Sequence, residues 1–265
     1  EIVFIFQPAE EGGAGAKAML QSGIFDEEPI KAVFAAHMFP ELPMGHIKVA
    51  PEVSNAAADN LFFRLKGKGG HGAHPHHCKD PIVAGSYLIT QLQSIISREL
   101  PPLESAVISI GRFQGGTASN IIPEEAVLEG TLRTLKPDIR LEIIKRLEDM
   151  VDGVARSFGI TATLNIIEGY PVLINNPVLV DHVVTCAKEI LGEGNVHSGL
   201  PRMGAEDFAY FCQKWGGVMV GIGCHDPSKG FQHGLHSPYF DLDERVLEVG
   251  VRLFGNILTN YLEIH

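Results

Sequence analysis

The sequence lacks any apolar run that approaches the length of a membrane-spanning helix. Such a helix needs about 20 consecutive apolar residues, and no stretch of the 265 residues comes near that length. We therefore expect neither an integral membrane protein nor a membrane partner.

Cysteine is scarce as well. No two of the four cysteines form a C-x-x-C pair, and they are scattered over the chain: Cys78, Cys186, Cys212 and Cys224. This excludes a disulfide scaffold, which needs many paired cysteines in a short chain. A reducing compartment is then the default, and we expect a cytoplasmic protein.

Positive charge is in deficit. Lys and Arg number 21 against 32 Asp and Glu, which gives a formal net charge of −11. Proteins that bind nucleic acid or anionic membranes rely on surface cations, so we expect no nucleic-acid partner. The deficit does not exclude a local cationic pocket for a small anion.

The chain is rich in apolar residues, and their spacing is typical of strands and helices. Hydrophobic residues make up 45% of it. Short continuous apolar runs predict strands covered on both faces, and they fall at 2–6 and 32–36. A third strand is predicted at 46–50. With a helix at 14–21 between the first two, the order favours an α/β layer with parallel strands. We assign residues 1–52 to the first part of this domain.

The pattern changes near Pro51 and changes back near Pro171. Between these points the order is β-α-β-β-α-β, which is that of a ferredoxin-like α+β domain. Its strands are predicted at 62–68, 107–113, 126–135 and 160–167, and its helices at 80–100 and 137–158. We place this inserted domain at 53–167. Residues 168–265 return to the first domain, with helices at 177–191, 207–214 and 243–262 and strands near 196 and at 218–223.

The first candidate site follows the first predicted strand. Glu10 and Glu11 stand side by side before two glycines. Ligands in open α/β sheets bind at the carboxyl ends of strands, so one carboxylate could hold a metal while the other activates water. Spacing alone fits equally well with the alternative, a pair of solvated acids near the positive end of a helix.

Histidines stand at two further strand ends. His37 follows the strand 32–36, and His236, with His233 as its weaker rival, lies beyond the strand 218–223. A neutral imidazole at either place could bind zinc or manganese. Taken singly, a hydrogen-bonded core histidine is the commoner explanation for His37.

A third cluster has four histidines and a cysteine in eight residues: His71, His74, His76, His77 and Cys78. It could form a metal loop, although structural zinc sites pair two separated knuckles and no partner knuckle follows. Alternatively, one histidine polarises a substrate carbonyl. A solvated loop is the simplest interpretation of His74 and His77.

The remaining candidates are weak by themselves. Asn120 could donate to a substrate oxygen or shape a turn, and Arg133 could clamp a carboxylate or lie exposed on its strand. Glu206 or Asp207 could simply cap the helix that follows them.

The order of these motifs resembles that of the aminoacylase-like dinuclear metallohydrolases (peptidase family M20). The nearest branch is that of hippurate hydrolases and indole-acetyl amino acid amidohydrolases. The matching stretches span nearly the whole chain: Gln7-Pro-Ala-Glu-Glu-Gly12, Gly67-Lys-Gly-Gly-His71 with Pro75-His76, Gly115-Gly-Thr-Ala-Ser-Asn120, Glu129-Gly-Thr-Leu-Arg133, Gly204-Ala-Glu-Asp-Phe208 and Leu235-His-Ser-Pro238. Together they are far more specific than any one of them.

The resemblance implies a role for each matching residue. Glu10 would be the general base that activates water, and the metal ligands would be Glu11, His37 and His236. His71 and Asn120 would stabilise the oxyanion, His71 in some relatives from the partner subunit. Arg133 would hold the substrate carboxylate, while His76 and Glu206 would contact the substrate in less defined roles.

The resemblance also implies a fold, a cofactor and a partner. The first and third segments would form a zinc-peptidase-like three-layer catalytic domain, truncated at the N-terminus, and the insert would be a lid through which a homodimer forms. Two divalent metal ions per site would be expected, of zinc, manganese, cobalt or nickel. The substrate would be an N-acyl or N-aroyl amino acid, hydrolysed to a carboxylic acid and a free amino acid.

One departure from the family qualifies this expectation. Relatives carry an upstream Cys-Gly-His-Asp-type segment that supplies two more metal ligands, and these residues contain none. Because a core strand is also predicted at the first residues, we expect a fragment that binds metal weakly and turns over poorly by itself. Two other functions stay open: a metallo-dipeptidase or carboxypeptidase on the same scaffold, and a non-catalytic metal-binding or dimerisation module.

Overall fold

The computed structural model describes residues 1–264, and it divides into two compact units. Unit 1 comprises Glu1–Asn55, Leu173–Arg202 and Glu206–His265, and unit 2 comprises Ala56–Val172 and Met203–Ala205. The domain boundaries proposed from the sequence, and the role of the insert as a dimerisation lid, stay predictions.

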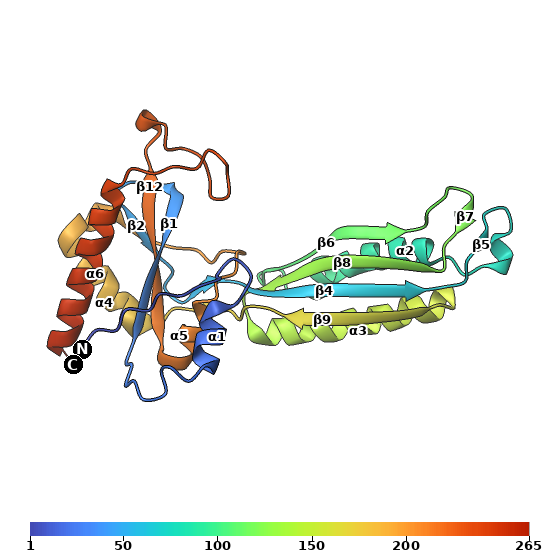
Figure 1. Ribbon diagram of the computed structural model, residues 1–265, viewed down its shortest axis with the longest axis horizontal. Helices are drawn as coiled ribbons and strands as arrows, with labels where there is room; N and C mark the ends of the chain where they lie inside the picture. Colours follow the sequence, from blue (N-terminus) through green and yellow to red (C-terminus); the bar gives the residue numbers. More distant parts are fainter. Residues whose placement is uncertain (265) are drawn as a thin grey trace. The chain divides into compact units, whose positions relative to one another are not determined.

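Unit 1 is built on a four-stranded mixed sheet of order β1-β12-β2-β11 (Figure 1). Its strands are β1 (Val33–Pro43), β2 (Ile47–Val49), β11 (Val196–Ser198) and β12 (Gly217–His225). β1 and β12 are parallel, as are β2 and β11, but β12 and β2 are antiparallel. The expected parallel pairing is thus found in two of the three strand pairs. The pair of β12 with β2 departs from it, because the three-residue turn after β1 reverses the chain and β12 lies between β1 and β2.

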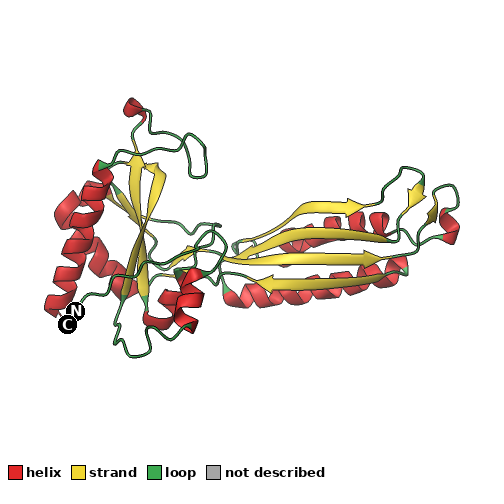
Figure 2. Ribbon diagram, viewed as in Figure 1, coloured by secondary structure: helices red, strands yellow, loops and turns green. Residues whose placement is uncertain are grey.

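Helices cover both faces of this sheet (Figure 2). One face packs on α4 (Pro177–Leu191) and α6 (Arg245–Ile264), and the other on α1 (Gly15–Gln21) and α5 (Ala209–Trp215). β12 is buried over eight consecutive residues because it has a hydrophobic cluster on each side. Short elements complete the unit: β3 (Val53–Asn55), β10 (Leu173–Ile174), η3 (Glu193–Asn195) and η4 (Pro227–Lys229).

The predicted strand at 2–6 is absent. Residues 1–9 form no helix or strand, and Phe4 and Phe6 are 76% and 88% exposed. An apolar run becomes a strand only where a neighbour takes up its backbone hydrogen bonds. No described strand pairs with this segment, and only Ile5 packs against the α1 side of the core.

Unit 2 has the order β-α-β-β-α-β that the sequence pattern predicts. Its antiparallel sheet has the order β6-β8-β4-β9, formed by β4 (Ala57–Lys66), β6 (Ala106–Gly115), β8 (Glu125–Thr134) and β9 (Thr161–Glu168). On β4, alternate residues are buried, which is typical of a sheet with one covered face. The covering helices are α2 (Pro81–Ser94), continued by a π-helical turn (Ile95–Glu99), and α3 (Pro137–Phe158).

Two small elements extend unit 2 beyond its main sheet. β5 (Gly70–His71) pairs with β7 (Ile121–Ile122), and the 3-10 turn η1 (Pro75–His77) follows β5. Asp80 then caps α2, because its side chain accepts hydrogen bonds from the Ile82 N–H at 2.8 Å and the Val83 N–H at 3.3 Å.

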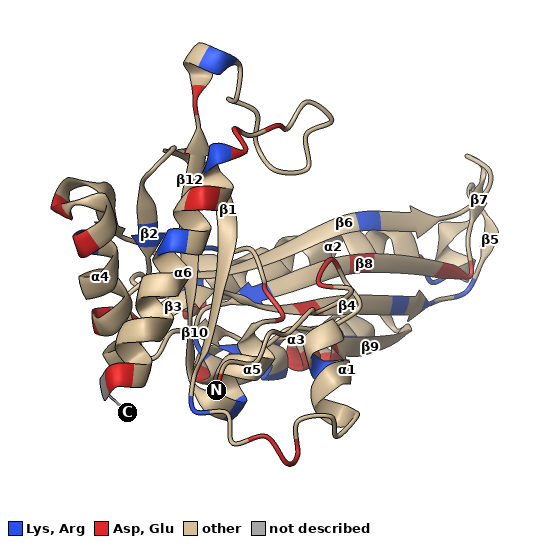
Figure 3. Cartoon of the chain, turned by 60° about the vertical axis from the view of Figure 1, so that its left-hand side comes forward, with Lys and Arg blue, Asp and Glu red and all other residues tan. Residues whose placement is uncertain are grey.

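Positively and negatively charged residues are not segregated into separate large regions of the molecule. Lys and Arg are scattered among Asp and Glu over both units in Figure 3. None of the helices within residues 1–264 combines the length and the apolar character that crossing a bilayer requires.

Candidate metal centre and catalytic residues

The loop after residue 6 places Glu10 in unit 1. Ala9 and Ala14 both have left-handed backbone conformations, with φ of 56° and 50°, and the chain turns tightly between them. Gly15 is needed where the loop meets α1, because a Cβ there would lie 1.7 Å from the Pro8 carbonyl oxygen. The turn is therefore possible only with glycine at position 15, where the backbone lies against Pro8.

Asp207 holds this loop from the other end of the chain. It is fully buried, accepts a hydrogen bond from the Ala16 N–H at 2.9 Å, and accepts another from the Gln7 amide. Sequence reasoning considered Asp207 only as a helix cap and gave Gln7 no role. Both residues lie within the family-like motifs, and this was the only signal that could have identified them.

Three carboxylates converge at this point. Oxygen atoms of Glu10, Glu206 and Asp207 all lie within 4.8 Å of one another. Burial is the largest cause that raises the pKa of Glu10, and the negative charges of Glu11 and Asp207 add to it. Burial likewise raises the pKa of Glu206 to about 7, with a further contribution from Glu10. The cluster therefore concentrates negative charge in a place with little solvent to screen it.

The two predicted histidine ligands lie near the same carboxylates. Electrostatic interaction with the rings of His37 and His236 acts to lower the pKa of Glu10, so both rings lie within electrostatic range of it. His37 lies within β1 rather than after it, because pairing with β12 continues to Phe39. His236 is exposed and has a left-handed backbone, with φ of 62°.

The tautomer of His37 suits a metal ligand. Its Nδ1 lies 2.9 Å from the Met38 carbonyl oxygen, which can only accept, so Nδ1 carries the proton. The Nε2 lone pair is then available, and a carbonyl partner on the other ring nitrogen is what metal-binding histidines commonly have.

These donors fit a divalent cation. Carboxylate oxygens and imidazole nitrogens are ligands that zinc and manganese accept. A cation would stabilise the ionised carboxylates, whose pKa values are raised mainly by burial and further by their mutual repulsion. Of the predicted ligands, Glu11 is exposed and acts on Glu10 through its charge. The structure thus brings the predicted residues Glu10, Glu11, His37, Glu206 and His236 into one region of unit 1.

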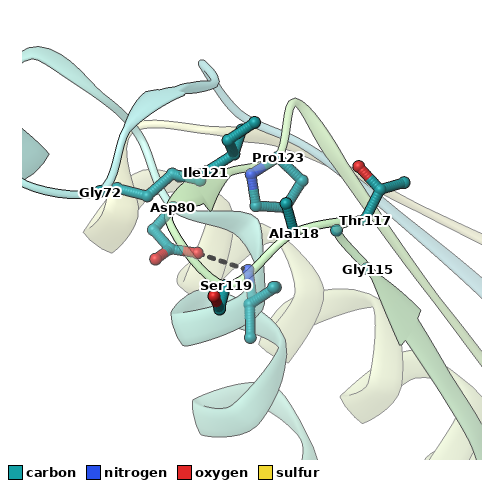
Figure 4. A pocket seen from close by; sticks show the side chains of 11 residues that line it. Gly72, Asp80, Gly115, Thr117, Ala118, Ser119, Ile121 and Pro123 are labelled. Atoms are coloured by element: carbon teal, nitrogen blue, oxygen red, sulfur yellow. Dashed lines mark hydrogen bonds between the residues drawn. The ribbon is translucent and has the colours of Figure 1, made fainter.

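Unit 2 brings together two other predicted residues that are distant in sequence. His71 on β5 pairs with Ile121 on β7, and the Gly72 N–H donates to the Asn120 carbonyl at 2.8 Å. A cavity of about 470 Å³ lies beside them, between the loop after His71 and the 115–123 loop (Figure 4). Its lining includes Gly72, Thr117 and Ser119.

His71 also has a defined tautomer. Its Nδ1 accepts a hydrogen bond from the Ala73 N–H at 3.0 Å, so the proton of the neutral ring is on Nε2. An exposed Nε2–H is a donor, which suits the stabilisation of a developing oxyanion rather than metal binding through that nitrogen.

The other histidines of the His71–Cys78 loop form no compact donor set. His74, His76 and His77 are exposed, and the rings of His76 and His77 lie 4.0 Å apart. Within residues 1–264, Glu10, Glu206 and Asp207 are the only group of three potential metal ligands whose atoms come within 4.8 Å of one another. The geometry therefore gives no support to a metal loop here, and the substrate role of His76 stays a prediction.

Arg133 lies far from His71 within unit 2. β7 leads directly into the start of β8 at Glu125, whereas Arg133 is eight residues further along the strand (Figure 1). At about 3.4 Å per residue, this corresponds to roughly 27 Å. One small substrate molecule cannot contact both side chains of the same unit.

Comparison with known proteins agrees with these motifs. The chain is 38% identical over 259 residues to N-acetyldiaminopimelate deacetylase from Brevibacillus brevis, covering 98% of the chain and 67% of the relative. It is 40% identical over 248 residues to the protein of the same name from Streptococcus uberis, covering 93% and 64%.

A solved structure shares the fold. The Bacillus subtilis YXEP protein, described as a dinuclear metal-binding peptidase of the M20 family, superimposes with a TM-score of 0.81 at 31% identity, covering 98% of this chain and 65% of the other. The chain thus spans about two thirds of the length of these relatives. The profile of peptidase family M20/M25/M40 matches residues 1–260. The chain therefore belongs to peptidase family M20/M25/M40 and has its α/β fold.

Proposed function

We propose that this chain is the greater part of a metal-dependent amidohydrolase that cleaves N-acyl amino acids. The observation that carries the proposal is the convergence of Glu10, Glu206 and Asp207 with His37 and His236 nearby. Relatives named N-acetyldiaminopimelate deacetylase support an acetylated amino acid as the substrate class.

The bound cation would supply Lewis acidity and make water acidic enough to react near neutral pH. Glu11, His37 and His236 are the proposed ligands. Glu206 lies close enough to Glu10 to join them, and we favour this role over substrate binding.

Glu10 is the proposed general base. A carboxylate whose pKa is raised by burial and like charges takes a proton from water more readily than an ordinary glutamate does. Protonated Glu10 then returns that proton to the nitrogen of the leaving amine. His71 Nε2–H and Asn120 donate to the oxyanion of the tetrahedral intermediate, and Arg133 holds the substrate carboxylate.

The test combines metal content with turnover. After loading with manganese or zinc, the 265-residue chain and a form extended upstream to the length of its relatives are analysed for bound metal and for hydrolysis of N-acetyl and N-benzoyl amino acids. We expect hydrolysis and two metal ions per chain in the extended form, and weaker binding with poor turnover in the shorter one. An extended form that binds metal but hydrolyses none of these amides would support the non-catalytic module. Cleavage of dipeptides alone would support the peptidase.

The separation of His71 and Arg133 supports a homodimer with composite sites. If both residues act on substrate, the roughly 27 Å of strand between Glu125, beside β7, and Arg133 means that one chain serves two different sites. A symmetric pair of chains supplies such an arrangement.

Subunit mixing tests this dimer. His71→Ala and Glu10→Gln are each expected to lower hydrolysis at least 100-fold. After the two variants exchange subunits, half of the dimers are mixed and each has one intact site, so activity should recover to about a quarter of the wild-type value. As the matched control, each variant is taken through the same exchange procedure alone. No recovery despite demonstrated exchange would contradict a site that takes Glu10 and His71 from different subunits.

A further inference from the structure

A second cavity lies in unit 1 on the same face of the sheet as His37. It measures about 150 Å³, and its lining comes from β1, β2, β12 and the segment 199–202. Phe39 on β1 is one of the lining residues, and its ring centroid is 6.3 Å from that of His37. Because alternate residues of a strand share a face, the cavity opens beside the proposed metal centre.

One wall of this cavity is formed by the guanidinium group of Arg202. A Cβ at Gly221 would lie 2.5 Å from the Phe39 ring, so the absence of a side chain at Gly221 lets that ring lie against β12. The guanidinium carbon of Arg202 stands 4.2 Å from the centroid of the Phe39 ring. Such stacking is favourable for arginine and restricts its orientation.

Arg202 is held by two further contacts. Its Nη2 lies 3.0 Å from Glu41 Oε1, and its backbone N–H donates to the Ser54 carbonyl at 2.8 Å. Glu41 occupies one of the five N–H donors of the guanidinium. Within residues 1–264 no other ion pair of this guanidinium is found, so its other donors can serve a second anion.

Lys48 contributes a second cation to the cavity. It lies on β2, is partly buried, and has its stem close to Gly199. No ion pair of Lys48 is found among residues 1–264. A partly buried lysine without an ion-pair partner among these residues favours the binding of an anion. Two cations and one carboxylate thus line a cavity in a chain whose formal net charge is −11.

We propose that this cavity binds a carboxylate at the far end of the substrate side chain, between Lys48 and Arg202. The substrate would then be an N-acyl amino acid with a second acidic group, an assignment that rests on the proposed function. A volume of 150 Å³ corresponds to about five water-sized groups at roughly 30 Å³ each. This is enough for a carboxylate and one or two methylenes, and a longer side chain would extend from the cavity toward His37.

Binding of glutarate tests the cavity without any need for turnover. Titration calorimetry is done on the 265-residue chain after metal has been removed with EDTA and the EDTA dialysed away, so that neither metal nor a competing carboxylate contributes. Neutral glutaramide is the reference ligand. We expect Lys48→Met to weaken glutarate binding at least 10-fold. Lys31→Met removes the same charge from an exposed position of unit 1 and should leave binding unchanged. Equal affinity in Lys48→Met and wild type, or no glutarate binding by wild type, would overturn the proposal.

Kinetics in the extended form separate this proposal from the proposed function. N-acetyl-2-aminoadipate and N-acetylnorleucine have side chains of similar length, and only the first ends in a carboxylate. Lys48→Met should raise the KM for the acidic substrate at least 10-fold and leave its kcat unchanged. The kcat and KM for the neutral substrate should both stay the same. An equal effect on both substrates would refute the carboxylate subsite and leave the amidohydrolase intact. Glutarate binding that depends on Lys48, in a protein that hydrolyses no amide, would refute the amidohydrolase and leave the anion site standing.

Discussion

Replacing Glu10 by glutamine is expected to lower kcat for N-acetyl amino acid hydrolysis by about 10³–10⁴-fold, near the upper end of what general acid–base groups contribute. Glutamine has nearly the same shape but neither accepts the proton of the attacking water nor returns one to the amine. KM should change little, because Glu10 is not proposed to bind the substrate. The measurement is steady-state hydrolysis in the metal-loaded, extended form.

The loss should not come from unfolding. Burial and like charges raise the pKa of Glu10 above its ordinary value, so its ionised form destabilises the metal-free folded state at neutral pH. Removing the charge should leave the free energy of unfolding unchanged or increase it. Glu28→Gln, at an exposed position of the same unit, is the matched control and should retain full activity. A Glu10→Gln protein within 10-fold of wild type would exclude Glu10 as the base.

Replacing Asp59 by alanine is expected to destabilise unit 2 by about 3 kcal/mol, as for other buried ion pairs that lose one partner. Asp59 is 2% exposed on β4, and both of its oxygens accept from Arg140 on α3, at 2.6 and 2.8 Å. Alanine would leave a guanidinium whose side chain is only 18% exposed. Its remaining contact, to Glu168 at 3.3 Å, is with an exposed carboxylate and offers little compensation.

Urea unfolding followed by two probes measures this effect. The single tryptophan, Trp215, is in unit 1, so its fluorescence reports that unit while far-UV circular dichroism reports both. Asp59→Ala should move the circular dichroism midpoint to lower urea. Glu125→Ala breaks an exposed pair with Arg64 in the same unit and should cost about 0.5 kcal/mol or less. Equal stability of the two variants would contradict the importance of the buried pair.

The helices and most strands could be predicted because their patterns are local. In unit 2, the alternation along β4 and the helical repeat of α3 are written in consecutive residues, and Asp80 marks the start of α2. The apolar run at 2–6 looks the same as a buried strand, but whether it pairs depends on neighbours that the local sequence does not contain. The extension of β1 past His37 was missed for the same reason, since it depends on pairing with β12.

Residues of the candidate site could be predicted only where they lie in recognisable sequence motifs. Glu10, His37 and His236 became candidates because they follow predicted strands, and the resemblance to a family assigned their roles. The structure brings them near one another. Asp207 was missed because its contacts are with Gln7 and Ala16, about 200 positions earlier in the chain. The distance between His71 and Arg133 depends on strand direction and register, which motif order does not reveal.

The pairing of β1 with β12 has a consequence for the order in which the protein folds on the ribosome. The hydrophobic cluster of unit 2 uses residues between Leu61 and Ile166, so it can form once that stretch has emerged. The sheet of unit 1 cannot close until β12, which ends at His225, is also available. At about 5–20 residues per second, residues 167–225 take roughly 3–12 s to synthesise. During this time β1 has no β12 to pair with. The nascent chain would thus expose the apolar β1 beside a finished unit 2, and this interval is when chaperone binding or aggregation would act on it.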